Sequence, residues 1–327
     1  MNTETFGWGI IGPGSIAQSF ATGLSSVPDA KLVAVGSRTA DKAQQFAEKF
    51  GANASYSSYL EVVTDPNVDA VYIATPHPFH KEHTILALEH GKAVLCEKPF
   101  AINASETEEM VAVARKHNTF LMEAMWTRCL PLILQVKEML AQGAIGEPRM
   151  LQADFGFRAG IDPNGRLFNL ALGGGSLLDV GIYPISLSSM IFGPPVDVAG
   201  LADIGSTGVD EQAGFILKHA KGQLAVLCSA VRTNTTLEAT IYGTEGSIRI
   251  NGPWFVPKSF TVTKEGKSET VEVPFDSNGY NYEAVEVAAC VRAGKTESSI
   301  IPLSETIQMQ RTLDAVRAKF DLKYPNE

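Results

Sequence analysis

The sequence predicts an α/β protein, in which a doubly wound parallel sheet is followed by an α+β domain with a large, mostly antiparallel open sheet. Up to about residue 124, apolar runs of strand length alternate with helical patterns, which is typical of a parallel sheet covered on both faces. From about residue 196 to 273, strand-like runs follow one another with short turns, as in antiparallel sheets. The chain has 327 residues, too many for one small core, so two domains are expected.

Residues 1–124 form the predicted first domain. Its strands are expected at 6–11, 31–36, 69–74, 92–96 and 120–123, and its helices at 15–26, 40–50, 78–90 and 105–117. Thr39 can cap the second helix, and Gly51 is expected to end that helix.

Residues 125–327 form the predicted second domain. Its helices are expected at 132–142, 176–192, 280–293 and 304–319, and its first strand at 150–157. The long helix at 176–192 follows three consecutive glycines. The last helix, at about 304–320, can pack back on the first domain.

Charge and composition exclude several kinds of partner. The formal net charge is −9, which argues against a broad nucleic-acid surface, because such surfaces use many Lys and Arg side chains. We find no apolar run of bilayer length and no secretory leader, so a cytoplasmic protein without a membrane partner is expected. The cysteines lack a CxxC pair, which indicates reduced thiols; they are Cys96, Cys129, Cys228 and Cys290.

The stretch GIIGPGSIA joins the first strand to the first helix. It fits the pattern G-x-G-x-x-G/A through the residues Gly12, Pro13, Gly14, Ser15, Ile16 and Ala17. The first glycine permits a tight turn, the second lets a pyrophosphate approach the backbone, and the small last residue lets the helix pack on the sheet. The helix N-terminus offers free N–H groups to that pyrophosphate. The stretch therefore predicts a dinucleotide-binding Rossmann domain, and a glycine-rich turn without a ligand is the alternative.

The residues after the second strand predict which dinucleotide binds. An NAD site usually carries Asp or Glu there, but this chain has Ser37 and Arg38. Arg38 can hold a 2′-phosphate by charge-assisted hydrogen bonds, the Ser37 hydroxyl adds a donor, and Lys42 adds charge one turn later. We expect NADP as the cofactor, with NAD as the alternative; a solvated Arg38 before a helix is the structural alternative.

Two further stretches follow strands of the parallel sheet, and ligands of such sheets bind beyond the carboxyl ends of the strands. The cofactor is therefore expected to meet Thr75, Pro76, His80, Glu97 and Lys98. Burial and a cationic nicotinamide ring both disfavour the charge of Lys98, which suits a general base for an alcohol. A structural ion pair between Lys98 and Glu97 is the alternative.

Three histidines spaced by three, at His77, His80 and His83, do not predict a metal site. Zinc sites need ligands with a shared focus and usually a carboxylate or cysteine as well. His77 lies among prolines outside the expected helix, so no metal is expected.

Several stretches together resemble one family. GIIGPGSIA, SRT, ATPHPFH, EKPF and GGGSLLDVGIYPI are similar to the Gfo/Idh/MocA oxidoreductases, and EAMWTRCLP and ADFGF resemble the dimeric dihydrodiol dehydrogenases and NADP-dependent D-xylose dehydrogenases. The resemblance implies reversible hydride transfer between NADP and a secondary alcohol of a sugar or a cyclic trans-diol. It also implies a homodimer or homotetramer formed through the second sheet.

The resemblance also assigns residues. It implies that Lys98, Asp179 and Tyr183 are catalytic, with Tyr183 or Lys98 as the proton acceptor, and that Trp126 and Arg128 line the nicotinamide or the substrate. Asp179 and Tyr183 are four residues apart, so they share a helix face. Structural alternatives remain open, since Asp179 can belong to a capping box and Tyr183 can be a core residue.

Two other functions remain open at this point. One is a cofactor-sensing binding protein that catalyses no reaction. The other is a reductase of a non-sugar carbonyl or double bond, as in the related biliverdin reductases.

Overall fold

The computed structural model describes residues 5–325 and 327, and the chain forms two compact units. The first unit contains residues 5–101, Ser105–Trp126 and Asp276–Thr306; the second contains Ile102–Ala104, Thr127–Phe275 and Ile307–Glu327. The predicted division near residue 124 had assigned all of Asp276–Thr306 to the second domain. The structure instead returns this segment to the first unit.

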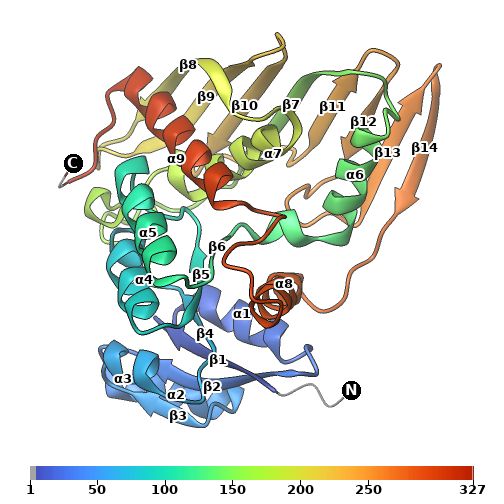
Figure 1. The fold of residues 1–327 in the computed structure, drawn as a ribbon. Helices are drawn as coiled ribbons and strands as arrows, with labels where there is room; N and C mark the ends of the chain where they lie inside the picture. Colours follow the sequence, from blue (N-terminus) through green and yellow to red (C-terminus); the bar gives the residue numbers. More distant parts are fainter. Residues whose placement is uncertain (1–4, 326) are drawn as a thin grey trace. The chain divides into compact units, whose positions relative to one another are not determined.

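The first unit is built on a six-stranded parallel sheet with the order β3-β2-β1-β4-β5-β6 (Figure 1). Its strands are β1 (Phe6–Ile11), β2 (Ala30–Gly36), β3 (Ala54–Tyr56), β4 (Ala70–Ile73), β5 (Ala93–Glu97) and β6 (Leu121–Ala124). The chain order reverses at β1, which lies between β2 and β4. Ligands of such sheets bind at this switch point, outside the carboxyl ends of the strands.

The helices of this unit are α1 (Ser15–Leu24), α2 (Ala40–Phe50), α3 (Tyr59–Thr64), α4 (His80–Glu89), α5 (Ala104–His117) and α8 (Tyr280–Arg292). α8 lies beside α1 (Figure 1), and Asn278 Nδ2 donates to the Ser19 carbonyl at 2.8 Å. A Cβ on Gly23 would come within 2.9 Å of Tyr280 Cβ, so this glycine permits the close approach. Thr39 stands at the predicted N-cap position of α2, but its side chain makes no capping hydrogen bond.

The second unit contains an eight-stranded sheet with the order β14-β13-β12-β11-β7-β10-β9-β8. Its strands are β7 (Pro148–Gly156), β8 (Pro195–Ile204), β9 (Asp210–His219), β10 (Leu224–Ala230), β11 (Ala239–Gly243), β12 (Gly246–Ile250), β13 (Ser259–Lys264) and β14 (Lys267–Glu272). All neighbours are antiparallel except β7 and β10. The predicted fold class is therefore confirmed for both sheets.

The helices of the second unit include α6 (Pro131–Ala141) and α7 (Ile182–Phe192), and α9 (Leu303–Arg317) begins in the first unit and ends in the second. The predicted helix at 176–192 is two pieces, a π-helical turn at Leu177–Gly181 and α7. Pro184 lies in the first turn of α7 and has no N–H to donate to the preceding turn, which accounts for a change of helix type here. Such π turns are frequent at functional sites.

One apolar segment corrects the expectation that no run has bilayer length. Among the described residues, Leu170–Phe192 has the length and hydropathy of a membrane span, but 83% of its most apolar window is buried inside the protein. Burial in a large core requires the same apolar composition as a bilayer. The segment is therefore explained by its place in the core of the second unit.

Candidate functional site

The glycine loop after β1 leaves room above the first turn of α1. Gly12 has φ +89°, and a Cβ there would lie 2.9 Å from the Ala74 carbonyl oxygen. Gly14 precedes α1, and a Cβ built on it would meet nothing within 4 Å. Ala17 is fully buried. The loop thus has the tight turn, the open approach and the close helix packing that a pyrophosphate site requires, and the first turn of α1 carries no acidic residue.

Pro13, Ser15 and Ile16 complete this loop and the start of α1, and none of them is buried. They surround the helix N-terminus, whose N–H groups and dipole favour an anion. Their contact with a cofactor stays a prediction.

A hollow of about 390 Å³ lies beside the end of β2. Its lining consists of Arg38, Ser57, Ser58, Tyr59, Thr75, Pro76, Phe79, Glu82 and His83. The Arg38 guanidinium carbon lies 5.8 Å from the centre of the Phe79 ring, and the Tyr59 and His83 rings meet edge to face at 4.6 Å. Aromatic rings beside a guanidinium suit a nucleobase with a phosphate, so the hollow fits the adenosine half of a phosphorylated dinucleotide.

Two of the residues predicted around Arg38 have different surroundings. Ser37 is buried, and its Oγ accepts a hydrogen bond from the Thr39 N–H at 3.2 Å. Lys42 is exposed on α2 and is not among the residues that line the hollow. The structure therefore groups Arg38 with aromatic side chains that sequence reasoning missed.

His80 ties together the loops that follow β4 and β5. Its Nε2 lies 2.8 Å from the Thr75 carbonyl oxygen, and its Nδ1 lies 2.9 Å from the Pro99 carbonyl oxygen. The ring is fully buried, and burial lowers the pKa of His80 to about 4. A neutral ring can donate to only one of the two carbonyls. His80 is thus a buried link between the two loops. Pro76, in the first of these loops, is exposed.

The histidines do not converge on a common point. His83 Nδ1 lies 3.0 Å from Thr75 Oγ1, whereas the two ring nitrogens of His80 lie beside the Thr75 and Pro99 carbonyl oxygens. Among residues 5–325 and 327, no group of three His, Cys, Asp or Glu side chains is arranged to hold a metal ion. All four cysteines are free thiols.

Lys98 follows β5, and buried glutamates lie beside it in sequence or close to Glu97 in space. Glu97 is 5% exposed; one of its carboxylate oxygens accepts from the Tyr72 hydroxyl, and the other accepts from the Lys98 backbone N–H at 3.1 Å. Glu283 of α8 is fully buried, and burial together with Glu97 raises the pKa of Glu283 well above its usual value. The Glu97 carboxylate accepts from the backbone of Lys98, and Lys98 is itself half-buried.

Trp126 and Arg128 are close in sequence but belong to different units. The Trp126 ring stacks on Tyr280, with centroids 4.5 Å apart. Arg128 is 3% exposed, and its guanidinium donates to the Ser186 carbonyl of α7 at 3.3 Å. Trp126 thus packs within the first unit and Arg128 bonds within the second, and their contact with the nicotinamide or substrate remains a prediction.

Asp179 and Tyr183 lie on the π turn and on α7 of the second unit. The Asp179 carboxylate forms an ion pair with Arg166 at 2.6 Å. Tyr183 packs against Phe155 and Phe255, with ring centroids 5.1 and 6.0 Å away. Phe155 and Phe255 stack at 4.1 Å. Both predicted residues are thus buried, one beside a cation and the other in an aromatic wall.

Asp210 fixes the start of this helical segment. Its Oδ2 accepts from the Leu177 N–H at 2.7 Å and from Ser176 Oγ at 2.8 Å, so Asp210 bonds to the first residues of the segment. Burial raises the pKa of Asp210 to about 7. A Cβ on Gly175 would lie 2.1 Å from Asp210 Oδ1, which explains why glycine stands there. Nothing in the local sequence pairs Asp210 with residues more than thirty positions earlier.

Sequence comparison agrees with this architecture. Residues 6–125 match the model of the GFO_IDH_MocA oxidoreductase family with an NAD-binding Rossmann fold, and residues 133–249 match the GFO/IDH/MocA C-terminal domain. The trans-1,2-dihydrobenzene-1,2-diol dehydrogenase of Mus musculus is 39% identical, and the match covers 98% of each chain. The enzyme of the same name from Homo sapiens is 37% identical, again over 98% of each chain.

Solved structures share the fold over nearly the whole chain. The 3-ketoreductase KijD10 from Actinomadura kijaniata, in complex with NADP and TDP-benzene, is 26% identical with a TM-score of 0.87, covering 97% of this chain and 98% of the other. The aldose-aldose oxidoreductase from Caulobacter crescentus, complexed with glycerol, is 25% identical with a TM-score of 0.89, covering 97% of each chain.

Proposed function

Because this chain belongs to the Gfo/Idh/MocA family of NAD(P)-binding oxidoreductases, we propose that it transfers hydride reversibly between NADP and a secondary alcohol of a sugar or a cyclic trans-diol. The relatives named above are a diol dehydrogenase, a 3-ketoreductase and an aldose-aldose oxidoreductase. The observation that carries the proposal is the arrangement of the first unit, where the Arg38 hollow, the open glycine loop and Lys98 all follow carboxyl ends of strands in one parallel sheet.

The proposal assigns each group a task. The N-terminus of α1 and Gly14 hold the pyrophosphate, and Arg38 holds the 2′-phosphate. NADP, when bound, supplies the hydride acceptor. Lys98 or Tyr183 takes the proton of the substrate hydroxyl, and the other polarises that oxygen. Asp179 orients the substrate through its carboxylate. The apolar wall of Phe155 and Phe255 beside Tyr183 limits water.

A substrate screen tests this function. We expect reduction of NADP with at least one member of a panel of pentoses, hexoses, inositols and trans-1,2-dihydrobenzene-1,2-diol, measured by NADPH absorbance, and slower reduction of NAD. The reverse direction is assayed with NADPH and the matching carbonyl compounds. Tight NADPH binding without turnover on any alcohol would favour a cofactor-sensing protein, and turnover restricted to non-sugar carbonyl or double-bond compounds would favour the reductase alternative.

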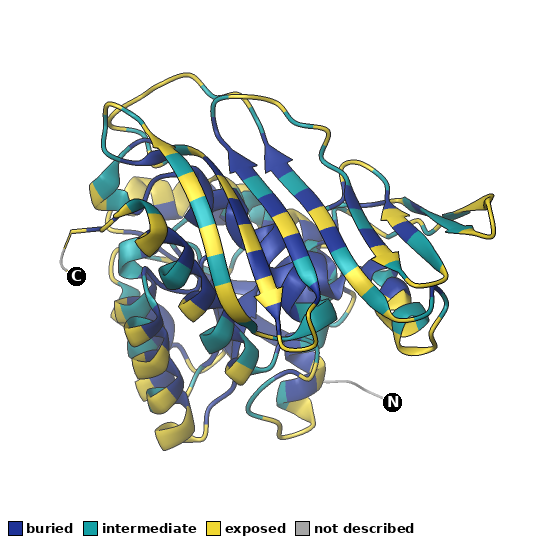
Figure 2. Cartoon of the chain, turned by 90° about the horizontal axis from the view of Figure 1, so that it is seen from above, coloured by how far each residue is buried: buried dark blue, intermediate teal, exposed yellow. Residues whose placement is uncertain are grey.

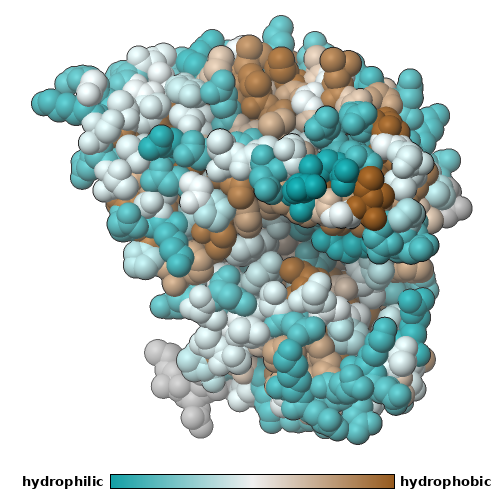
Figure 3. All heavy atoms as spheres, turned by 180° about the vertical axis from the view of Figure 1, so that it is seen from behind, coloured by the Kyte–Doolittle hydropathy of each residue, from teal (hydrophilic) through white to brown (hydrophobic). Residues whose placement is uncertain are grey.

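The open face of the second sheet supports a further part of the proposal, a homo-oligomer. Exposed and buried residues alternate along these strands (Figure 2), and hydrophobic side chains gather at the surface in the upper part of Figure 3, where this sheet lies in Figure 1. Leu201 is 81% exposed, and it pairs across β8 and β9 with Gly214. Val226 and Ile216, paired across β10 and β9, are also exposed.

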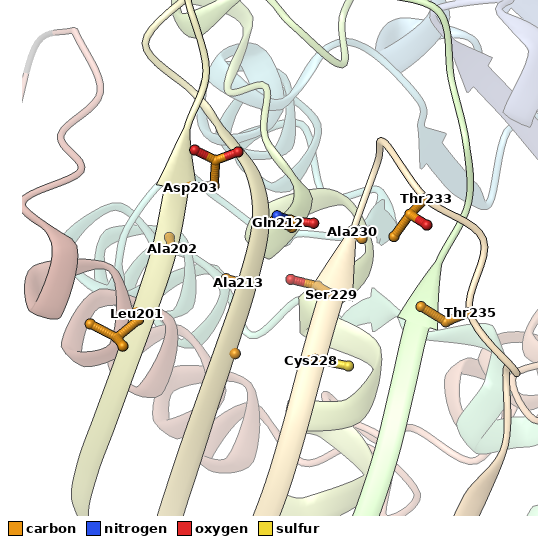
Figure 4. A pocket seen from close by; sticks show the side chains of 11 residues that line it. Leu201, Ala202, Asp203, Gln212, Ala213, Cys228, Ser229, Ala230, Thr233 and Thr235 are labelled. Carbon is orange, nitrogen blue, oxygen red and sulfur yellow. The ribbon is translucent and has the colours of Figure 1, made fainter.

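A shallow hollow of about 380 Å³ lies on the same strands, bordered by Leu201, Asp203, Cys228 and Thr235 (Figure 4). In a twofold interface the same surface of each copy meets itself. The protruding Leu201 of one copy can therefore fill the hollow of the other. We propose that a second copy of the chain covers this face.

Replacing Leu201 by aspartate is expected to dissociate the oligomer, because each copy would bury an uncompensated charge at the interface. Analytical ultracentrifugation of Leu201→Asp should show the monomer at concentrations where the unmodified protein is larger. Leu60→Asp is the control, since Leu60 of α3 is exposed to 49% and lies on the other unit. A monomeric unmodified protein would contradict the proposal.

A further inference from the structure

The Arg166–Asp179 ion pair joins a buried carboxylate to a half-exposed guanidinium. Arg166 Nη1 lies 2.6 Å from Asp179 Oδ1, and the side chains are 55% and 5% exposed, respectively. An ionised carboxylate that is almost fully buried is costly unless a cation or hydrogen bonds compensate it. The exposed end of Arg166 keeps part of its hydration, so the pair avoids most of the cost of burying two charges.

The backbone around Arg166 is locked to the glycine loop that precedes Asp179. A Cβ on Gly174 would lie 2.9 Å from the Arg166 carbonyl oxygen and 2.8 Å from that of Leu167. The Gly175 N–H donates to the Leu167 carbonyl at 2.9 Å. The absence of side chains at these glycines therefore lets the two segments touch along their backbones.

The segment after Arg166 is also anchored on the sheet side. Phe168 is 2% exposed and packs in a small core with Val209 and Val231. Its N–H and that of Asn169 both donate to the Gly165 carbonyl at 3.1 Å, which forms a tight turn at Arg166. The guanidinium is consequently presented to Asp179 from a fixed base and not from a free surface loop.

We propose that Arg166 is a positioning residue for the reaction, which keeps the Asp179 carboxylate charged and fixes which of its oxygens faces the substrate. The Arg166 guanidinium binds Asp179 Oδ1. This contact sets the orientation of the whole carboxylate. This proposal rests on the proposed function, in which Asp179 contacts the substrate. It adds a residue that neither the glycine pattern nor the helix pattern of the sequence indicated.

Steady-state kinetics with the best substrate of the screen test this role. Arg166→Ala is expected to lower kcat/KM about 100-fold, the effect of a misplaced catalytic group, while the Kd for NADPH stays unchanged. Arg166→Lys should recover part of the loss. Millimolar guanidinium chloride should restore Arg166→Ala about tenfold through the same charge-assisted bond, because the site of the missing side chain is half-exposed; sodium chloride at equal concentration should not.

Arg149→Ala is the matched control. Arg149 belongs to the same unit, is 45% exposed and pairs with Glu147 at 3.1 Å, so its loss should change neither kcat nor the response to guanidinium.

A stability cycle gives a second readout that needs no substrate: the effects of Arg166→Ala and Asp179→Asn on the unfolding free energy should be non-additive in the double variant.

The outcomes separate the two proposals. If Asp179→Asn loses activity while Arg166→Ala keeps kcat/KM within twofold, or gains nothing from guanidinium after a loss, the positioning role is overturned and the proposed function stands. If Asp179→Asn is fully active, the assignment of Asp179 within the proposed function fails as well. If no substrate turns over, the stability cycle decides. Additive unfolding free energies of the two single variants overturn the positioning role, and non-additive ones support an Arg166–Asp179 interaction that orients the carboxylate.

Discussion

Replacing Lys98 by methionine is expected to lower kcat by roughly three orders of magnitude, within the range that general acid–base groups contribute. Methionine keeps most of the length and apolar volume of the lysine side chain but removes its ammonium. The Glu97 carboxylate should keep its bond to the backbone N–H of residue 98, so the loop should not change. Steady-state kinetics with the best substrate of the screen measure the effect.

The binding of NADPH separates a chemical role of Lys98 from a binding role. Fluorescence titration of Lys98→Met should give a Kd close to that of the unmodified protein, because the phosphate contacts are assigned to α1 and Arg38. Lys31→Met, an exposed lysine at the start of β2, serves as the control. Near-normal turnover in Lys98→Met would remove Lys98 from the mechanism.

Replacing Arg38 by aspartate is expected to reverse the preference between the two dinucleotides. The change removes a charge-assisted contact and puts a carboxylate where NAD sites usually carry one. We expect affinity for NADP to fall about 100-fold, since a hydrogen bond to a charged group contributes about 1.5–3 kcal/mol and the new charge repels the 2′-phosphate. Affinity for NAD should change little.

Parallel titrations of both dinucleotides check this result. Arg115→Asp, an exposed arginine on α5, controls for the change in net charge and should leave both affinities as they are. An equal loss of affinity for NADP and NAD in Arg38→Asp would mean that Arg38 supports the shape of the hollow, by its contact with Phe79, and does not read the phosphate.

Local patterns were sufficient for the fold class and for much of the first unit. The glycine motif, the alternation of strand and helix and the run of strands after residue 196 each reflect interactions within a few residues, and both sheets appear as expected. Local patterns were less reliable at element ends. The helix predicted at 176–192 is a π turn followed by α7, because a proline and hydrogen bonds to Asp210 shape its start.

The order of amino acids was enough to predict a dinucleotide-type glycine loop, an arginine where an acid is usual, and a lysine at the end of a parallel strand. The surroundings of these groups became apparent only in the folded chain: the aromatic lining beside Arg38, the carboxylate of Glu97 on the Lys98 backbone, the packing of α8 beside α1, and the guanidinium of Arg166 on Asp179. The physical reason is distance along the chain. Turns, caps and strand alternation depend on near neighbours, whereas burial and ion pairing depend on which distant segments the packed core brings into contact.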